Sequence, residues 1–363
     1  MKRSDKELLD RTVTIMNPTH IKPARYSLYI FIILLLSLSG AGYGSAGDKA
    51  PVHAVDAVGM TVSDMDRSAA FYADVLGFEK ISDVEVLGDD YEHLHGIFGL
   101  RMRVVRMRLG EESIELTEFL TPQGRPFPAD TRSNDRWFQH IAIVVSDMDK
   151  AFERLRNNKV RYASTAPQTI PAWNKAAAGI RAFYFRDPDG HFLEIIYFPA
   201  GKGNPKWQRN RNDDKLFLGI DHTAIVVNDT EESLKFYKGA LGMNVAGESM
   251  NYGTEQEHLN NVFGAVLRIT SLRAGEGPGI EFLEYLAPGD GRPAPADERS
   301  NDIQHWQTTL DTDDPNGLAD KLRDDGYAII SADTVDLPGG ELGFKKGFLV
   351  RDPDGHVMQV IEK

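Results

Sequence analysis

The chain has 363 residues, with 41 Lys and Arg against 54 Asp and Glu, which gives a formal net charge of −13. This acidic balance argues against a nucleic-acid partner, because phosphate binding needs clustered Lys and Arg. The absence of cysteine excludes disulfides, zinc–thiolate sites, iron–sulfur clusters and thiol nucleophiles. Any metal site must therefore use His, carboxylate or amide oxygen.

The first 47 residues have the order of an export signal. Lys22 and Arg25 precede an apolar run at 26–38, and small residues follow it as far as Gly47. The run is short for a membrane span, which needs about 20 apolar residues. We therefore expect a signal peptide, with an uncleaved membrane anchor through residues 26–46 as the alternative. In both cases the rest of the chain is expected to be exported, to the periplasm or the cell exterior.

The remainder of the chain repeats itself. FYADVLGF at 71–78 matches FYKGALGM at 236–243, and RDPDGH at 186–191 recurs at 351–356, both with an offset of 165. GRPFPADTRSND at 124–135 matches GRPAPADERSND at 291–302 with an offset of 167. These matches predict two copies of one unit, residues 52–200 and 217–363, joined by a polar linker at 201–216.

Strand-like and helical segments alternate within each copy, and Asp-Gly pairs in the two RDPDGH segments indicate hairpin turns. In chain order, the sequence predicts a strand at 58–62, a helix at 66–76, strands at 102–109, 114–120 and 141–145, a helix at 149–157, and strands at 180–185, 192–198, 220–227 and 304–310. The pattern predicts an α+β fold made of four βαβββ modules, two in each copy.

These modules resemble the vicinal oxygen chelate superfamily. The resemblance is carried by VSDMDRSAAFYADVLGF at 62–78, HIAIVVSDMDKA at 140–151, DHTAIVVNDTEESLKFYKGALGM at 221–243 and the two RDPDGH turns. The family includes glyoxalase I, methylmalonyl-CoA epimerase, extradiol dioxygenases and the bleomycin- and fosfomycin-resistance proteins. The resemblance implies that pairs of modules close into two cup-shaped mixed-sheet barrels. Each barrel is then expected to hold one divalent metal ion, and donors of this kind suit Zn, Fe, Mn or Ni.

The resemblance places metal ligands on the first and last strands of each module. The first-strand positions are Ala57, His140, His222 and His305, and the last-strand positions are Glu115, Glu194, Glu281 and Gln359. If each copy closes its own barrel, the first site has Glu115, His140 and Glu194, since Ala57 cannot ligate. The second site then has His222, Glu281, His305 and Gln359. The carboxylates of Glu115, Glu194 and Glu281 are the candidate proton carriers.

Other repeated residues have two interpretations each. His191 and His356 end the hairpin turns and are expected to be structural. His93 and His258 lie in a loop or short helix, where they either support the fold or face the substrate. The RSND segments at 132–135 and 299–302 either anchor a loop between modules or line the site through Arg132 and Arg299. The FY pairs at 71–72 and 236–237 are expected in the core.

The expected function is that of an exported, metal-dependent, glyoxalase-like enzyme acting on a small oxygen-chelating substrate. Lewis-acid and proton-transfer chemistry of the lyase or isomerase type fits the ligand set. The alternatives are an extradiol-type ring-cleaving dioxygenase, which the amide of Gln359 disfavours, and a non-catalytic small-molecule binding or resistance protein. Metal analysis of the purified protein separates the enzyme from the binding protein.

Overall fold

The computed structural model describes residues 50–209, 215–337 and 339–363. The predicted export signal or membrane anchor at 1–47 lies outside the described residues. Residues 49–363 belong to one compact unit. Among the described residues, no helix combines the length and the apolar composition that crossing a membrane requires.

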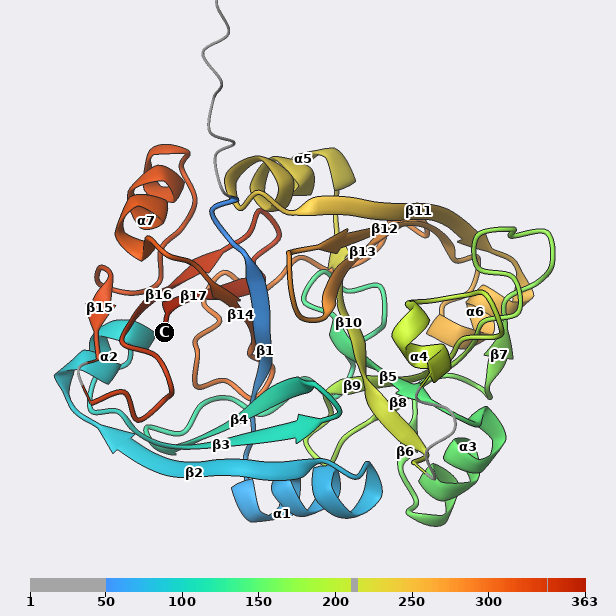
Figure 1. Cartoon of the computed structure of the whole chain (residues 1–363), viewed down its shortest axis with the longest axis horizontal. Coiled ribbons are helices and arrows are strands. Elements are labelled where there is room, and N and C mark those ends of the chain that lie inside the picture. The colour runs from blue at the N-terminus through green and yellow to red at the C-terminus, as the bar shows by residue number, and fades with distance from the viewer. Residues whose placement is uncertain (1–49, 210–214, 338) are drawn as a thin grey trace, which may run out of the picture. The chain divides into compact units, whose positions relative to one another are not determined.

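Four modules of strands and helices follow one another along the chain, as predicted (Figure 1). The first copy contains β1 (Ala54–Thr61), α1 (Met65–Ala70), the π-helical turn η1 (Phe71–Val75), β2 (Glu79–Leu87), α2 (Asp89–His95), β3 (Arg101–Leu109), β4 (Glu112–Thr121), β5 (Gln139–Val145), α3 (Met148–Asn157), β6 (Arg161–Tyr162), β7 (Gln168–Thr169), β8 (Arg181–Arg186) and β9 (Phe192–Tyr197). The linker contains α4 (Pro205–Arg209). The second copy contains β10 (Phe217–Val227), α5 (Thr230–Leu234), η3 (Lys235–Ala240), β11 (Asn244–Tyr252), α6 (Thr254–Asn260), β12 (Val266–Arg273), β13 (Gly279–Ala287), β14 (Trp306–Asp311), α7 (Pro315–Asp324), β15 (Val335–Asp336), β16 (Lys346–Arg351) and β17 (Val357–Glu362). The α+β class is confirmed.

An aspartate caps the helix that follows the first strand of every module. The carboxylates of Asp64, Asp147, Asp229 and Asp314 each accept a hydrogen bond from a backbone N–H in the first turn. Such caps satisfy amide groups that have no partner inside the helix, and each stabilises the helix by about 1 kcal/mol. The repeated Asp therefore sets where each strand–helix turn ends.

The sheets join modules from different copies. Sheet A has the strand order β15-β16-β17-β14-β1-β4-β3-β2, and sheet B has the order β11-β12-β13-β10-β5-β9-β8-β6. Strand β1 pairs with β14, and β5 pairs with β10, both antiparallel (Figure 1). The expectation that each copy closes its own barrel is therefore wrong. All four first strands are followed by an Asp-capped helix in the same order, so the sequence alone does not select their partners.

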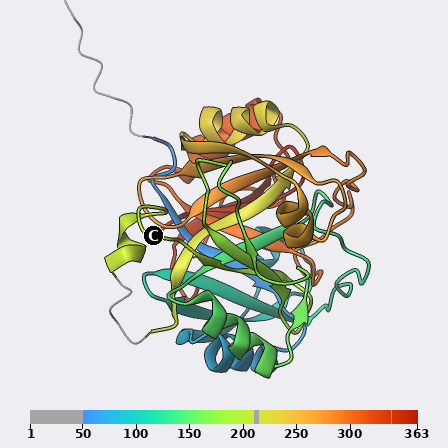
Figure 2. The same ribbon diagram turned by 90° about the vertical axis from the view of Figure 1, so that its right-hand side faces the viewer.

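Within each copy, the two modules pack through their helices. Figures 1 and 2 place α1 beside α3 and α5 beside α7, on opposite sides of the two sheets. Tyr72 donates from its hydroxyl to Asp187, and Tyr237 donates in the same way to Asp352. Both tyrosines and Phe236 are fully buried, and Phe71 is partly buried against the same core, as expected of the FY pairs.

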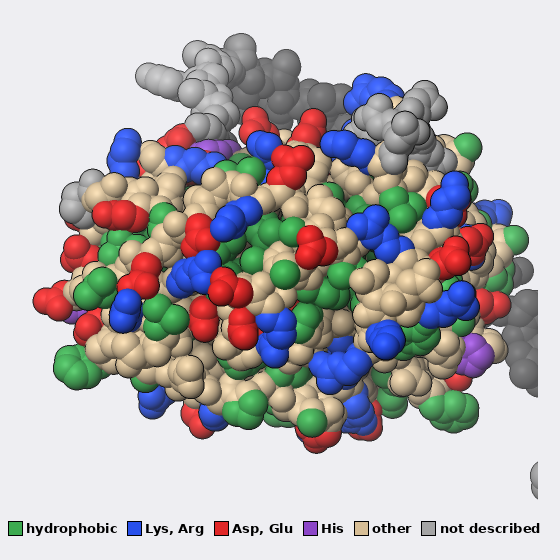
Figure 3. All heavy atoms as spheres, turned by 90° about the horizontal axis from the view of Figure 1, so that it is seen from below, with side chains coloured by type: hydrophobic (Ala, Val, Ile, Leu, Met, Phe, Trp, Pro, Cys, Tyr) green, Lys and Arg blue, Asp and Glu red, His purple; other side chains and the backbone are tan. Residues whose placement is uncertain are grey.

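Ion pairs between arginine and aspartate also join the two copies. Arg125 of the first copy binds Asp302 of the second through its Nε and Nη2 atoms, and Arg292 of the second binds Asp135 of the first in the same way. The RSND and GRPxPAD motifs thus anchor loops between copies. On the face shown in Figure 3, acidic and basic side chains are interspersed rather than gathered by sign.

Candidate metal centre

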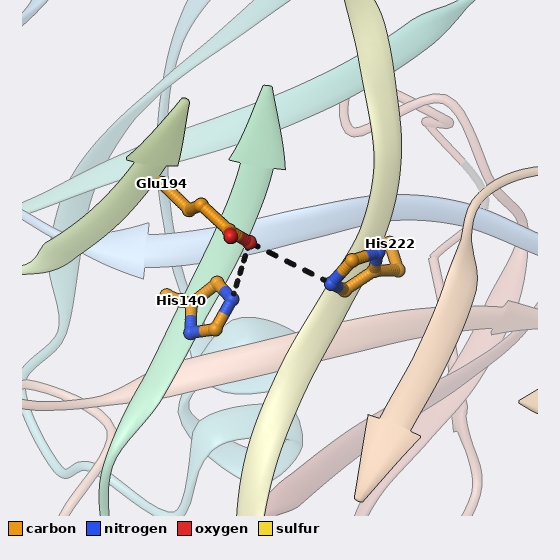
Figure 4. Close-up of side chains that lie close together, drawn as sticks. All are labelled: His140, Glu194 and His222. Carbon is orange, nitrogen blue, oxygen red and sulfur yellow. Dashed lines mark hydrogen bonds and ion pairs between the residues drawn. The ribbon is translucent and has the colours of Figure 1, made fainter. Parts of the chain in front are cut away.

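Three buried side chains meet where the two copies join in sheet B. His140 on β5, Glu194 on β9 and His222 on β10 place one potential ligand atom each within 4.8 Å of the others (Figure 4). His140 Nε2 lies 3.1 Å from Glu194 Oε2, and His222 Nε2 lies 3.8 Å from the same oxygen. In the described residues this is the single group of three or more His, Asp or Glu arranged so tightly.

Strand register produces this cluster. His222 lies opposite Ala142, and Ala224 lies opposite His140, in the antiparallel β5–β10 pair. Ala142 in turn lies opposite Glu194 in the parallel β5–β9 pair. Alternate residues of a strand share one face, so both histidines point to the same side. Each histidine has an alanine as its cross-strand neighbour, which leaves room for both rings.

Glu281 on β13 lies at the edge of the cluster. It is opposite Ala224 in the parallel β10–β13 pair, and its Oε1 is 3.6 Å from His222 Nε2. The hydroxyl of Ser271 donates to the other carboxylate oxygen, Oε2, at 2.9 Å. Sheet B therefore brings together His140, Glu194, His222 and Glu281, two residues from each copy.

A second layer of side chains fixes His222. Its Nδ1 lies 3.0 Å from Asp221 Oδ2, and Arg273 Nη2 donates to the same oxygen at 3.0 Å. The indole Nε1–H of Trp207, in the linker helix α4, donates to Asp221 Oδ1 at 2.6 Å. Trp207 was missed by sequence reasoning, because a tryptophan in a polar linker carries no motif. A carboxylate that holds one imidazole nitrogen orients the other nitrogen toward a metal.

The charge around His222 favours a cation. Burial alone lowers the pKa of His222, but Glu281, Asp221 and Glu194 outweigh it and raise that pKa to about 9. Two imidazoles and two carboxylates without sulfur form a donor set that suits Zn, Fe, Mn or Ni. The residues present therefore fit a divalent metal ion, and the donor set does not choose among the four.

The corresponding place in sheet A has lost this donor set. In sheet A, Gln307 lies opposite Gly59, and in sheet B His140 lies opposite Ala224. Likewise, Gln359 lies opposite Thr309 in sheet A, and Glu194 lies opposite Ala142 in sheet B. The offset of 167 seen in the RSND segments continues through β14, so Gln307 is the counterpart of His140. His305 is the counterpart of Phe138, and matching it to His140 was wrong. Sheet A thus offers Ala57, Glu115, Gln307 and Gln359.

An arginine neutralises the remaining carboxylate in sheet A. Arg106 Nη1 lies 3.0 Å from Glu115 Oε1 and 2.8 Å from Asp56 Oδ2. In sheet A, Arg106 lies opposite Glu115, and in sheet B Ser271 lies opposite Glu281. A guanidinium in sheet A therefore takes the position that a hydroxyl has in sheet B. Burial is the largest influence on Glu115 and raises its pKa. The Nε2 atom of Gln307 donates to Gln359 Oε1, so these two amides bind each other.

His305 has a different surrounding. Its Nδ1 lies 2.7 Å from Glu298 Oε1, and Glu298 is also bound by Arg351. Burial and the neighbouring His305 lower the pKa of His95 to about 3. The structure therefore brings together four of the seven predicted ligands and leaves Glu115, His305 and Gln359 outside the cluster. Metal binding itself stays a prediction for every one of them.

The remaining predicted residues lie away from the cluster. His191 is fully buried between Asp187 and the carbonyl of Ile303, as expected of a structural histidine. His93 and His258 are exposed on α2 and α6, and neither lines the cavity beside the cluster. Of the predicted site-lining arginines, Arg132 binds Asp290, Arg299 is exposed, and neither lines that cavity.

A cavity of about 530 Å³ opens onto the cluster. It is lined by Glu194, His222 and Glu281 and also by Gln256 of α6 and Ser249 of β11. This volume is in the range of small-molecule sites. In sheet A, the hollow beside His305 and Gln307 has no comparable space.

Comparisons with known proteins agree with this architecture. The family model described as "Glyoxalase/Bleomycin resistance protein/Dioxygenase superfamily" matches residues 54–195 and 219–360, more than half of the chain. The chain is 34% identical over 153 residues to a 2-epi-5-epi-valiolone epimerase from Actinomyces sp, covering 41% of this chain and 81% of that protein. It is 24% identical over 195 residues to glyoxalase I of Saccharomyces cerevisiae, covering 51% of this chain and 55% of that one.

Solved structures of the same fold cover most of the chain. Glyoxalase I from Zea mays superposes with a TM-score of 0.53 and 17% identity, over 86% of this chain and 92% of that one. A putative dioxygenase from Bacillus subtilis gives 0.53 and 14%, over 86% of each chain. At this identity the likeness concerns the fold alone. The duplicated modules, the His and Glu cluster and the matched residues lead to one conclusion: the chain belongs to the glyoxalase/bleomycin resistance protein/dioxygenase superfamily.

Proposed function

We propose that this protein is a metal-dependent enzyme that moves a proton on a small oxygen-chelating substrate, in an isomerase- or lyase-type reaction. The observation that carries the proposal is the buried cluster of His140, Glu194 and His222, with Glu281 beside it. Three of these residues, Glu194, His222 and Glu281, line a cavity. The epimerase relative supports the isomerase type. Export of the protein is part of the same proposal and rests on the order of residues in the first 47 positions.

His140, Glu194 and His222 are the residues that would hold the metal. When bound, a divalent ion supplies Lewis-acid stabilisation to oxygen atoms of the substrate. Asp221 keeps His222 oriented by holding its Nδ1 atom, while Trp207 and Arg273 keep Asp221 in place.

Glu281 is suited to carry the proton. The hydroxyl of Ser271 holds its Oε2, and Oε1 remains directed toward the cluster. The side chain is about one-fifth exposed (19%), so it reaches the cavity. Glu194 lies across the cluster and provides a second carboxylate. Two carboxylates on different sides of a bound carbon centre allow a proton to be removed on one side and returned on the other.

The test compares Glu281→Gln with Ser271→Arg. Loss of the general base is expected to lower kcat at least about 100-fold while the metal stays bound, since the three-residue cluster remains. Ser271→Arg copies the Arg106–Glu115 pair of sheet A, so it is expected to remove metal binding through a guanidinium placed at the cluster. Metal content by mass spectrometry and solvent-deuterium exchange into the substrate provide the two readouts. Retained exchange in Glu281→Gln would contradict the assignment of the base.

A second candidate is a ring-cleaving dioxygenase. Two histidines and one carboxylate, as in His140, His222 and Glu194, form the donor set of non-haem iron(II) oxygenases. Gln359 disfavoured a dioxygenase when the second copy was expected to form its own site. In the cluster built from both copies, Glu194 provides the carboxylate. Oxygen uptake by the iron(II)-loaded protein with a catechol would favour this candidate, and metal-dependent deuterium exchange without oxygen uptake would favour the isomerase or lyase.

A further inference from the structure

The cavity beside the candidate metal centre has no uncommitted Lys or Arg among its described lining residues. Four carboxylates line it, those of Glu194, Asp221, Glu248 and Glu281, and the one Lys or Arg among the described lining residues is Arg273. Arg273 is already bound to Asp221, with Nη1 donating to its carbonyl at 2.9 Å and Nη2 to its carboxylate at 3.0 Å. Arg268, which is not among the lining residues, donates from Nη2 to Glu248 at 2.8 Å. Glu194 and Glu281 are thus the lining carboxylates without a Lys or Arg partner in the described residues, and a divalent cation would balance their charge.

The rest of the polar lining is neutral and able to form hydrogen bonds. Besides the candidate ligand His222, it comprises the hydroxyls of Tyr184, Ser249 and Ser271 and the amides of Asn204, Asn251 and Gln256. Gln256 is 3% exposed, and its buried Oε1 atom has no hydrogen-bond partner in the described residues. Leaving such an atom unpaired is unfavourable, so a ligand hydroxyl that donates to it would remove this cost.

These observations exclude one class of substrate and favour another. A phosphate or carboxylate group on the substrate would lie near the carboxylates of Glu194 and Glu281 and find no Lys or Arg of the described lining free to bind it. Like charges brought together in an interface oppose binding. An uncharged substrate with several hydroxyls meets no such repulsion and matches the amide and hydroxyl lining. A site built to hydrogen-bond substrate hydroxyls discriminates strongly against substrates that lack them, because buried polar groups of the site would then stay unpaired.

We infer that the cavity takes an uncharged, polyhydroxylated ketone or aldehyde, whose neighbouring carbonyl and hydroxyl oxygens face the metal and whose remaining hydroxyls bind Gln256 and its neighbours. This inference rests on the proposed metal-dependent function. It concerns substrate charge, which the metal cluster itself leaves open.

A matched pair of probes tests the inference. D-erythrulose and D-erythrulose 4-phosphate share the same hydroxyketone end and differ in a terminal phosphate. Calorimetric titration of the metal-loaded full chain is expected to show at least about tenfold tighter binding of D-erythrulose. Equal or tighter binding of the phosphate would overturn the inference, and so would a metal-loaded protein that binds neither probe. A protein that binds no metal would instead refute the proposed function, so the two failures are distinguishable.

Two variants identify the residues responsible. Gln256→Leu removes the unpaired amide while keeping the volume, and it is expected to weaken D-erythrulose binding about tenfold without changing metal content. Glu248→Lys, at an exposed position of the lining, replaces the carboxylate bound by Arg268 with a second positive charge. It is expected to bring the phosphate's affinity to within a few-fold of that of D-erythrulose. If Glu248→Lys changed neither affinity, the electrostatic argument would be wrong.

Discussion

The linker helix α4 should matter for metal binding, although it lies outside both repeats. Trp207 is 1% exposed and donates its indole N–H to the carboxylate that holds His222. We predict that Trp207→Phe weakens both the fold and the metal site. The variant keeps an aromatic ring but removes the donor from Asp221, whose other partners, His222 and Arg273, remain.

The size of the effect follows from the contact. A hydrogen bond to a charged group contributes about 1.5–3 kcal/mol. The six-membered ring of Trp207 also packs tightly on Gly219, where an added Cβ would lie 2.8 Å from Cη2, so the smaller Phe leaves a gap that costs about 1 kcal/mol more. The free energy of unfolding should therefore fall by about 2–4 kcal/mol in urea titrations of the metal-free protein. Loss of such an outer-layer contact typically lowers metal affinity about 10- to 100-fold.

Two controls separate the hydrogen bond from the packing. Phe198→Leu reduces the same apolar cluster without touching Asp221, so it should lower stability by about 1 kcal/mol and leave metal affinity unchanged. Trp173→Phe alters a half-exposed tryptophan stacked on Tyr252 and should change stability by less than about 0.5 kcal/mol. If Trp207→Phe bound metal as tightly as the unaltered protein, the positioning role of Asp221 and Trp207 would be refuted.

Two further predictions concern stability. Asp135→Asn breaks the buried ion pair with Arg292 and should lower the free energy of unfolding by about 2 kcal/mol. Asp130→Asn, at the exposed ion pair of the same arginine, should lower it by no more than about 0.5 kcal/mol. Equal thermal midpoints for the two variants would contradict this. In metal-free protein, the pKa of His222 is raised to about 9, above the unfolded value of about 6.5. Its contribution, up to about 3 kcal/mol, is therefore present below about pH 6.5 and lost as the pH rises through about 9. The denaturation midpoint should fall over that window, and His222→Asn should flatten the profile.

Local patterns made the fold predictable. Strand-like and helical segments indicated the modules, the Asp-Gly pairs indicated the hairpin turns, and the offset of 165 revealed the repeat. The pairing of the four first strands was not predictable, because each of them opens a module of the same kind. The antiparallel pairs β1–β14 and β5–β10 join strands from different copies. A short distance along the sequence favours pairing within a copy. The structure instead pairs strands across copies, and the ion pairs Arg125–Asp302 and Arg292–Asp135 also join the two copies.

The candidate site was predictable in its residue types and not in its grouping. His140, Glu194, His222 and Glu281 were each predicted from the first- and last-strand positions that the family resemblance implies. The error at His305 came from matching one histidine to another, since an extra two residues before β14 place Gln307 at the ligand position. Trp207 and Gln256 were missed because their roles depend on contacts between distant segments, with Asp221 and with the cavity.

Metal stoichiometry tests the central claim most directly, namely that one composite site is built from both copies. We predict that the purified full chain, loaded with zinc and analysed by mass spectrometry, holds one metal ion per chain, because sheet A has lost its ligands and contains Arg106. His140→Ala and His222→Ala, one in each copy, should each abolish binding, while His305→Ala should retain it. Two ions per chain, or loss of metal in His305→Ala with retention in His222→Ala, would contradict the composite site.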